Sequence, residues 1–216
     1  MRIILPTPLT PAEFAANEMQ AGDLERDAIM TTRDIVLISL FAALIVAFGL
    51  MPPITLGFIP VPITMQSFGV MLAGVILGAK RGAFAPLLVI LLVAIGLPVL
   101  SGGRGGLAVF AAPTLGYLIG WVPAAYVAGL ISERVARSSS NAVFQVIAFF
   151  VAAVIGGIVV EYAFGIAWLA WGAGIGFSKA FYGSMAFVPG DLLKAGVAAL
   201  AARAVMVGYP LLPQRA

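Results

Sequence analysis

Residues 142–164 read AVFQVIAFFVAAVIGGIVVEYAF, an apolar run interrupted by a single charged residue, Glu161. A run of this length can cross the roughly 30 Å hydrocarbon core of a bilayer as one α-helix. The whole chain has the same character, because 62% of its 216 residues are hydrophobic, only 10% are charged and the mean hydropathy is +1.11. In a soluble domain about a quarter of the residues are charged. The composition therefore predicts an all-α integral membrane protein.

Five further apolar segments, separated by Pro, Gly and Ser clusters, bring the predicted number of transmembrane helices to six. They cover residues 34–51, 64–79, 82–98, 112–131 and 189–208. We expect a membrane domain over residues 34–208, preceded by a poorly ordered cytoplasmic extension at 1–33 and followed by a short tail at 209–216. Met30, just before the first span, is a candidate translation start. The segment 165–188 is interpreted as an interfacial Trp cluster followed by a glycine-rich loop.

Basic residues in the short linkers predict the orientation of these spans. They fall between spans two and three and between spans four and five, and they are Lys80, Arg81, Arg134 and Arg137. The positive-inside rule places these linkers in the cytoplasm, and an even number of spans then places both termini there. The segments before spans two, four and six face outward. Four polar residues are expected to converge on that side: Gln66, Arg104, Asp191 and Lys194.

Asp191 and Lys194 are the most informative of the four. They lie one helical turn apart in Pro189-Gly190-Asp191-Leu192-Leu193-Lys194, at the start of an apolar segment. Each ionisable group costs roughly 2.5–3.5 kcal/mol at the centre of a membrane helix, so the two must pair, line a cavity or bind a ligand. A structural explanation carries almost equal weight, since Asp191 can neutralise the positive end of the helix dipole and pair with Lys194.

Arg104 is flanked by glycines in Ser101-Gly102-Gly103-Arg104-Gly105-Gly106. Glycines let backbone N–H groups approach a ligand, and a guanidinium can hold a carboxylate through two parallel hydrogen bonds. The alternative is an ordinary flexible turn with a solvated arginine.

Gln66 and Glu161 are further polar residues at membrane depth. The Gln66 amide can bind a ligand, although contact with a neighbouring helix is the commoner role of such groups. For Glu161 we favour an interfacial or capping role over proton coupling.

Several function classes are excluded by what the sequence lacks. It contains no Cys and no His, which removes thiolate chemistry and the usual zinc or haem ligands, and we expect no metal and no cofactor. The segment GVILGAKR at 74–81 lacks the Gly-Lys-[Ser/Thr] ending of a nucleotide-binding P-loop. The net charge of +3 comes without a basic patch, so nucleic acid is not an expected partner. A catalytic residue is not identifiable.

The chain resembles the BioY family, the biotin-binding membrane subunits (S components) of energy-coupling factor (ECF) vitamin transporters. The resemblance covers about residues 34–208 and rests on five phrases in this order: IPVPITMQ at 59–66, LGAKRGA at 77–83, IGLPVLSGGRGG at 95–106, APTLGYLIG at 112–120 and FVPGDLLKAG at 187–196. It implies the six-helix S-component fold in a prokaryotic inner membrane, with a biotin site open to the outside.

The resemblance also implies roles for individual residues. Gln66 and Asp191 would bind the ureido ring of biotin, and Arg104 and Lys194 its carboxylate. The partners would be membrane lipid, a membrane T component and two ABC-type ATPases, which would hydrolyse the ATP. An Ala-x-x-x-Ala pattern in the first helix, matched by Ala43 and Ala47, would contact the T component. An S component for another vitamin, or a proton-coupled carrier that uses Glu161 and Asp191, are the alternatives.

Overall fold

A computed structural model describes residues 30–138, 141–209 and 211 of the chain. The chain divides into two compact units, residues 1–35 and residues 36–216. In the described part of the first unit, the backbone N–H of Asp34 donates to Oγ1 of Thr31 at 3.2 Å, and the backbone N–H of Thr31 donates to Oδ2 of Asp34 at 3.0 Å. This reciprocal pairing is a capping box that fixes the start of a helix. The expectations for residues 1–29 and 212–216 lie outside the described residues.

The described residues of the second unit form helices and loops, with no β-strand. The helices are α2 (Thr32–Gly49, which begins in the first unit), α3 (Gln66–Leu77), α4 (Ala79–Ala94), η1 (Leu107–Ala111), α5 (Leu115–Ser138), α6 (Ala142–Val154), η2 (Ile155–Val160), α7 (Glu161–Ala167), η3 (Trp168–Gly172), α8 (Phe177–Met185) and α9 (Val188–Gly208). The prediction of an all-α protein is therefore confirmed for this part of the chain.

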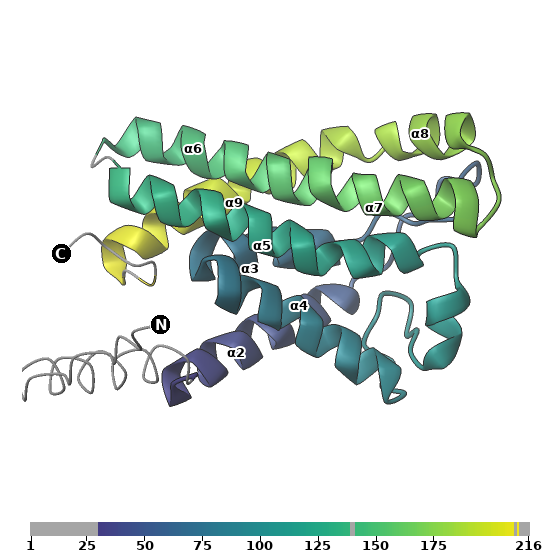
Figure 1. The fold of residues 1–216 in the computed structure, drawn as a ribbon, viewed down its shortest axis with the longest axis horizontal. Coiled ribbons are helices and arrows are strands. Elements are labelled where there is room, and N and C mark those ends of the chain that lie inside the picture. The colour runs from purple at the N-terminus through teal and green to yellow at the C-terminus, as the bar shows by residue number, and fades with distance from the viewer. Residues whose placement is uncertain (1–29, 139–140, 210, 212–216) are drawn as a thin grey trace, which may run out of the picture. The chain divides into compact units, whose positions relative to one another are not determined.

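The helix α5 is at the centre of the packing. It contacts α3 and α4 on one side and α6 and α7 on the other, while α9 packs against α3 and α6. In Figure 1, α6 and α7 run beside α5 as one continuous helix. Buried side chains from these elements form the main hydrophobic core, in which Ile45, Val70, Val89 and Phe149 are fully buried. The site described below depends on this arrangement, because it brings α3, α5, α7 and α9 together.

Small residues allow α3 and α5 to approach closely. A Cβ atom added to Gly74 would lie 2.7 Å from the carbonyl oxygen of Ala125 and 2.9 Å from the Cβ of Ala128. Side chains larger than hydrogen would therefore force the two backbones apart. In a bilayer, where lipid tails are as apolar as leucine, such close contact is a main source of helix association.

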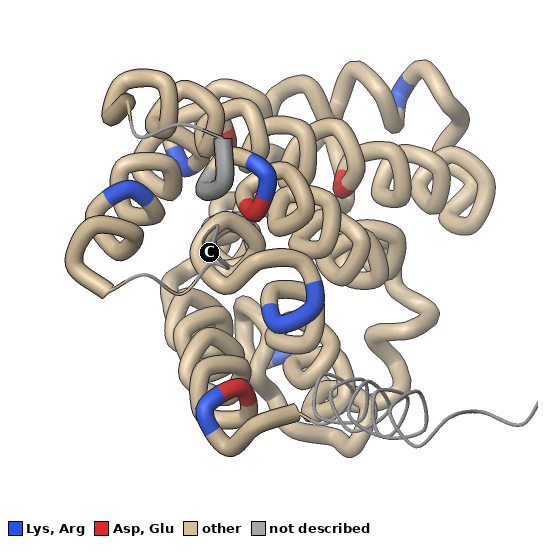
Figure 2. The backbone as a smooth tube through the Cα atoms, turned by 60° about the vertical axis from the view of Figure 1, so that its left-hand side comes forward, with Lys and Arg blue, Asp and Glu red and all other residues tan. Residues whose placement is uncertain are grey.

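Three helices in the described residues are long and apolar enough to cross a membrane: Thr32–Gly49, Leu115–Val135 and Ala142–Gly172. Helices α8 and α9 are bent by 50° relative to each other, and together they are long and apolar enough to form a fourth span. Helix α3 is apolar but only 12 residues long. Figure 2 shows how few charged residues the helices carry. The membrane character is thus supported, whereas the number of six spans stays a prediction.

The segment 165–188, interpreted as an interfacial Trp cluster followed by a glycine-rich loop, is more helical than expected: residues 165–172 and 177–185 are helical, and the glycine-rich turn between them covers only residues 173–176. The fifth predicted span continues past residue 164 to Gly172, because residues 165–172 remain apolar and the backbone bonds carry on through η3. A short turn at residues 173–176 follows, in which Gly174 and Gly176 have φ values of 68° and 82°. Glycine adopts these angles without steric cost, so the chain reverses there and enters α8.

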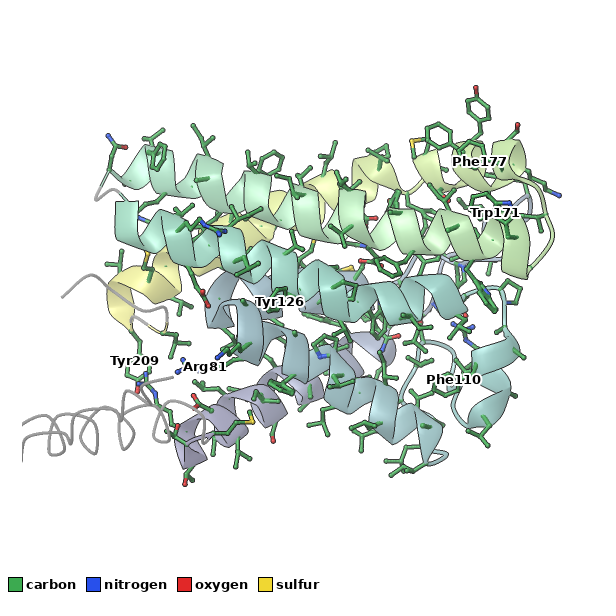
Figure 3. The ribbon with its side chains drawn as sticks, in the orientation of Figure 1. Arg81, Phe110, Tyr126, Trp171, Phe177 and Tyr209 are labelled. Atoms are coloured by element: carbon green, nitrogen blue, oxygen red, sulfur yellow. The ribbon has the colours of Figure 1, made fainter. Side chains whose placement is uncertain are left out.

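Two residues far apart in sequence mark one end of the helical unit. The guanidinium of Arg81, in the first turn of α4, donates to the backbone oxygen of Leu211 at 3.2 Å. Figure 3 shows Arg81 and Tyr209 close together at this end, with Phe110, Trp171 and Phe177 at the opposite one. The Lys80-Arg81 segment and the end of α9 therefore lie on the same side, as an even number of spans requires. Which side faces the cytoplasm remains a prediction.

Candidate functional site

A cavity lies where α3, α5, α7 and α9 meet the segments around residues 61–64 and 100–104. Its free volume is about 70 Å³. All four residues that the sequence predicts as ligand-binding line this cavity, and they are Gln66, Arg104, Asp191 and Lys194. The structure therefore brings together residues that are up to 128 positions apart (194 minus 66) in the sequence.

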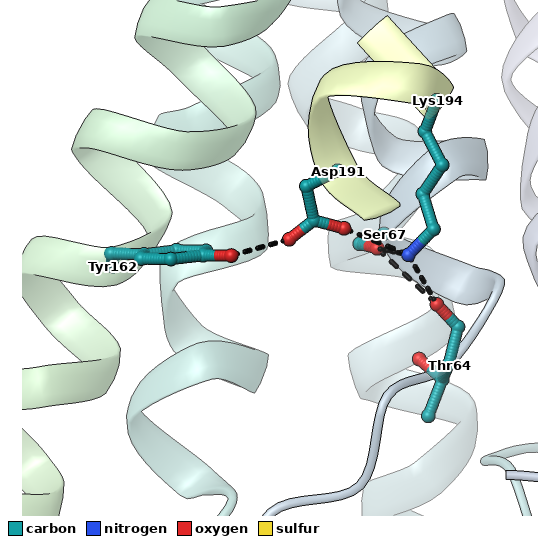
Figure 4. A network of polar contacts seen from close by, with 5 residues as sticks. All are labelled: Thr64, Ser67, Tyr162, Asp191 and Lys194. Carbon is teal, nitrogen blue, oxygen red and sulfur yellow. Dashed lines mark hydrogen bonds and ion pairs between the residues drawn. The ribbon is translucent and has the colours of Figure 1, made fainter. Parts of the chain in front are cut away.

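Asp191 and Lys194 form a buried ion pair in the first turns of α9. Lys194 Nζ donates to Asp191 Oδ1 at 2.8 Å, and the two residues are only 8% and 5% exposed (Figure 4). The helix begins at Val188 with Pro189 in its first turn, which is a favourable position for proline and places Asp191 near the positive end of the dipole. The structural explanation is therefore correct in one respect, since the two side chains form an ion pair with each other.

The ammonium group of Lys194 has further partners on α3 and in the segment just before it. It donates to the backbone oxygen of Thr64 at 2.7 Å and to Oγ of Ser67 at 2.9 Å, in addition to Asp191. A lysine ammonium has no more than these three N–H donors. All three N–H donors of Lys194 are therefore used by protein groups. In this arrangement the side chain holds Asp191 and links α9 to α3.

The carboxylate of Asp191 can accept more hydrogen bonds than the described part of the chain supplies. Its Oδ2 accepts a 2.6 Å hydrogen bond from the hydroxyl of Tyr162 on α7, as Figure 4 shows. Each carboxylate oxygen can accept more than one hydrogen bond, and each accepts one here from the described residues. Asp191 is therefore a fixed, charged acceptor at the wall of the cavity, able to receive an N–H group from a ligand.

Arg104 lies in a turn that its neighbours shape. Gly102 and Gly103 have φ values of 78° and 70°, and the backbone N–H of Arg104 donates to the oxygen of Leu100 at 3.2 Å. The guanidinium donates to the oxygen of Ser101 and to Oγ1 of Thr114, both at 3.2 Å. None of the carboxylates in the described residues forms an ion pair with it. Burial lowers the pKa of Arg104 from its ordinary value, but an arginine stays protonated at neutral pH. It is an uncompensated cation beside the cavity.

Gln66 is occupied by backbone groups. Its Oε1 accepts from the N–H of Ser101 at 2.9 Å, and its Nε2 donates to the oxygens of Val99 at 3.2 Å and Ile45 at 3.4 Å. The commoner role for a membrane amide, contact with neighbouring segments, is therefore what the structure shows. Gln66 lines the cavity, yet most of its bonding capacity fastens the loop that carries Arg104 to α2 and α3.

Aromatic residues that the sequence analysis did not single out form one wall of the cavity. Tyr117, Tyr162 and Phe187 meet edge to face, with ring centroids 6.0–6.4 Å apart. The hydroxyl of Tyr117 is 2.6 Å from Oγ of Ser184, which fixes its ring. These residues come from α5, α7 and the start of α9, so no local pattern in the sequence connects them. The one feature of the sequence that could have pointed to an aromatic wall is that Tyr162 directly follows the charged residue Glu161.

Glu161 does not have the interfacial or capping role that the sequence analysis favours. It is 4% exposed, lines the cavity and lies inside the continuous helix Ala142–Gly172, where there is no helix end to cap. The sequence shows its depth along a span, but only packing decides whether a side chain at that depth faces lipid or a cavity.

Ala43 and Ala47 lie away from the cavity, on the exposed side of α2. Leu40, which precedes Ala43 by three residues on the same helix, is 60% exposed, and Leu50, directly after the end of α2, is 83% exposed. Among the described residues no group of His, Cys, Asp and Glu could hold a metal ion.

Comparison with known proteins agrees with this architecture. A model of the BioY family matches residues 19–210. The "Biotin transporter BioY" of Rhizobium etli is 68% identical over 87% of this chain and 100% of its own length, and the protein of the same name from Rhodobacter capsulatus is 53% identical over 80% and 93%. A crystal structure of "the S-component for biotin from an ECF-type ABC transporter" superposes with a TM-score of 0.74 at 31% identity, covering 83% of this chain and 95% of the other. The chain belongs to the BioY family.

Proposed function

We propose that this protein is the biotin-binding S component of an ECF-type vitamin transporter and captures biotin from the outer side of the membrane. The observation that carries the proposal is the convergence of Asp191, Lys194 and Arg104 on one cavity with an aromatic wall. It is a transport subunit and not an enzyme, in keeping with the transporter names of its relatives.

The chemistry of biotin matches the groups around the cavity. Its ureido ring offers N–H groups, which suit the spare acceptor capacity of Asp191. Its carboxylate suits Arg104, which can bind it through two parallel hydrogen bonds. Its apolar bicycle suits the wall formed by Tyr117, Tyr162 and Phe187. Lys194 then acts on the ureido contact by holding Asp191, and Gln66 acts by fixing the loop of Arg104.

Binding requires the cavity to widen. Sites for small molecules usually measure about 300–1,000 Å³, whereas this cavity measures about 70 Å³. Part of the cavity wall is formed by two non-helical segments that connect helices, at residues 61–64 and 100–104. Movement of these loops on the outer side would admit the ligand while the helices keep Asp191 and Lys194 in place.

We further propose six transmembrane helices in a prokaryotic inner membrane, with both termini in the cytoplasm. Helices α3 and α4 would supply the two short spans, with α8 and α9 together forming the last one. The T component would bind at Ala43 and Ala47, and two partner ATPases would hydrolyse the ATP, since the chain has no P-loop.

The experiment is equilibrium binding to the purified protein in lipid nanodiscs, with biotin and with biotinamide, whose carboxylate is replaced by a neutral amide. The wild type is expected to bind biotin tightly and to prefer it over the amide. Asp191→Asn should weaken both ligands, whereas Arg104→Met should remove mainly the preference for biotin. Absence of biotin binding, or binding unchanged in both variants, would refute the proposal.

A further inference from the structure

Glu161 places a carboxyl group in the cavity that the assignments above leave without a role. It is 4% exposed and lies among the lining residues. Its Oε2 atom has no hydrogen-bond partner among the described residues. A buried polar atom without a partner costs free energy, and at the wall of a cavity a ligand can supply that partner.

The neighbours of Glu161 do not neutralise it. The charged groups that act on it are Asp191, which has the same sign, and Lys194. Lys194 directs its three hydrogen bonds to Thr64, Ser67 and Asp191, and none of them goes to Glu161. Trp121 on α5 is its hydrogen-bonding neighbour and can donate a single N–H. At least one oxygen of the carboxyl group is therefore available to a ligand.

The position of Glu161 complements that of Asp191. Glu161 lies in the α7 segment of the continuous helix Ala142–Gly172, and Asp191 is in the first turn of α9, so two different helices present a carboxyl group to one cavity. A cyclic urea has one N–H on each side of its carbonyl group. Two acceptors on separate walls can bind both N–H groups at once, which a single carboxylate cannot do without leaving one of them buried and unpaired.

We propose that Glu161 contacts the ligand directly and accepts one ureido N–H of biotin while Asp191 accepts the other. This inference rests on the proposed function. It makes Glu161 a specificity-determining residue, because a ligand with only one N–H, or with a substituted nitrogen, would leave one of the two carboxyl groups without its partner.

The test compares biotin with its two isomers methylated on one ureido nitrogen, in the full-length protein in nanodiscs. Glu161→Leu should lower biotin affinity by about tenfold or more, the loss expected for a hydrogen bond to a charged or strongly polar group. In this variant the isomer methylated on the nitrogen that faces residue 161 should bind about as well as biotin. The other isomer should remain discriminated as in the wild type.

The matched control is Gln145→Leu. Gln145 is also buried, at 5% exposure, and lies on the same continuous helix, but it does not line the cavity. This variant should bind all three ligands as the wild type does. Glu161→Ala provides a second test should the leucine variant fail to fold, since it removes the acceptor and makes room for the methyl group, so that binding of one methylated isomer should improve relative to biotin.

The outcomes separate this inference from the proposed function. If the wild type binds biotin and Glu161→Leu binds it equally well, Glu161 is not a ligand contact while the proposed function stands. An equal loss for biotin and both isomers would mean a general disturbance of the site, and would also overturn the inference. If the wild type does not bind biotin, both proposals fail.

Discussion

The hydroxyl of Tyr162 donates a 2.6 Å hydrogen bond to Oδ2 of Asp191, so that a residue of α7 fixes a carboxylate carried by α9. Lys194 holds the other oxygen at 2.8 Å. The carboxylate is thus clamped from two directions before any ligand arrives. Preorganisation of this kind increases affinity, because less side-chain freedom is lost on binding.

Tyr162→Phe removes this clamp without changing the shape of the aromatic wall. We expect the free energy of unfolding to fall by about 1.5–3 kcal/mol, the range for hydrogen bonds to charged groups, and biotin affinity to fall with it. Thermal unfolding and equilibrium binding measure the two effects. Tyr126→Phe is the control, since Tyr126 is 42% exposed on α5 and does not line the cavity. Equal behaviour of the two variants would show that the hydroxyl of Tyr162 has no special role.

Lys194→Met leaves Asp191 as a buried carboxylate without its cation. Breaking a buried pair in this way typically costs about 3–5 kcal/mol. In the double variant Asp191→Asn/Lys194→Met, the charge is gone from both positions, and we expect most of the lost stability to return while biotin binding does not. Recovery of binding in the double variant would contradict the role of Asp191 as the charged acceptor. Thermal unfolding with and without biotin distinguishes these results.

Gly49→Ala tests the role of Gln66 from a position outside the cavity. The added Cβ would lie 2.8 Å from Gln66 Nε2 and 2.8 Å from the oxygen of Val99, so the amide must give up its bond to the loop. We expect a loss of about 1–3 kcal/mol in stability, the cost of an unsatisfied buried group, together with weaker biotin binding.

Gly196→Ala is the control for this substitution. A Cβ at Gly196 meets nothing within 4 Å, and alanine in a helix is about 1 kcal/mol more favourable than glycine. This variant should be as stable as the wild type or more so, with unchanged affinity. If Gly49→Ala also leaves binding intact, the loop of Arg104 does not depend on Gln66.

We expect substitutions on the exposed face of α2 to disturb assembly with the partner proteins without changing biotin binding. Replacing Ala43 and Ala47 by tryptophan should prevent copurification with the T component and ATPases, because bulky side chains block close helix contact. Biotin affinity should be unchanged, since neither alanine lines the cavity. Val143→Trp, at a position 68% exposed on α6, controls for bulk on a surface. Normal assembly of the Ala43/Ala47 variant would place the interface elsewhere.

The membrane character and the identity of four cavity-lining residues were predictable from the sequence. Charge is so rare here that each buried ionisable residue is conspicuous, and the cost of burying it makes a pairing or a site the expected explanation. Asp191 and Lys194 were also close enough in sequence for their contact to follow from helical geometry alone. For the same reason their structural pairing and their place at a cavity could both be anticipated.

Other features depended on tertiary structure. The segment 165–188, interpreted as a Trp cluster and a glycine-rich loop, contains eight more helical residues of the long span (165–172) and the whole of α8. The glycines end the helix only where the backbone turns, at Gly174 and Gly176. Gln66 fixes the loop of Arg104 through hydrogen bonds to backbone groups 33 and 35 positions away in the sequence. Hydropathy carries no information about such pairs.

Composition and hydropathy were enough to predict a membrane protein, and polar residues are rare enough in its apolar segments that Gln66, Arg104, Asp191 and Lys194 stand out. The packing of the helices, which the sequence does not reveal, brings the Tyr162 hydroxyl to Asp191, directs the three donors of Lys194 to protein groups and turns Glu161 toward the cavity. The physical reason is that the depth of a residue along a span follows from its position in the chain. The direction in which its side chain points, and what it meets there, follow from how the helices pack.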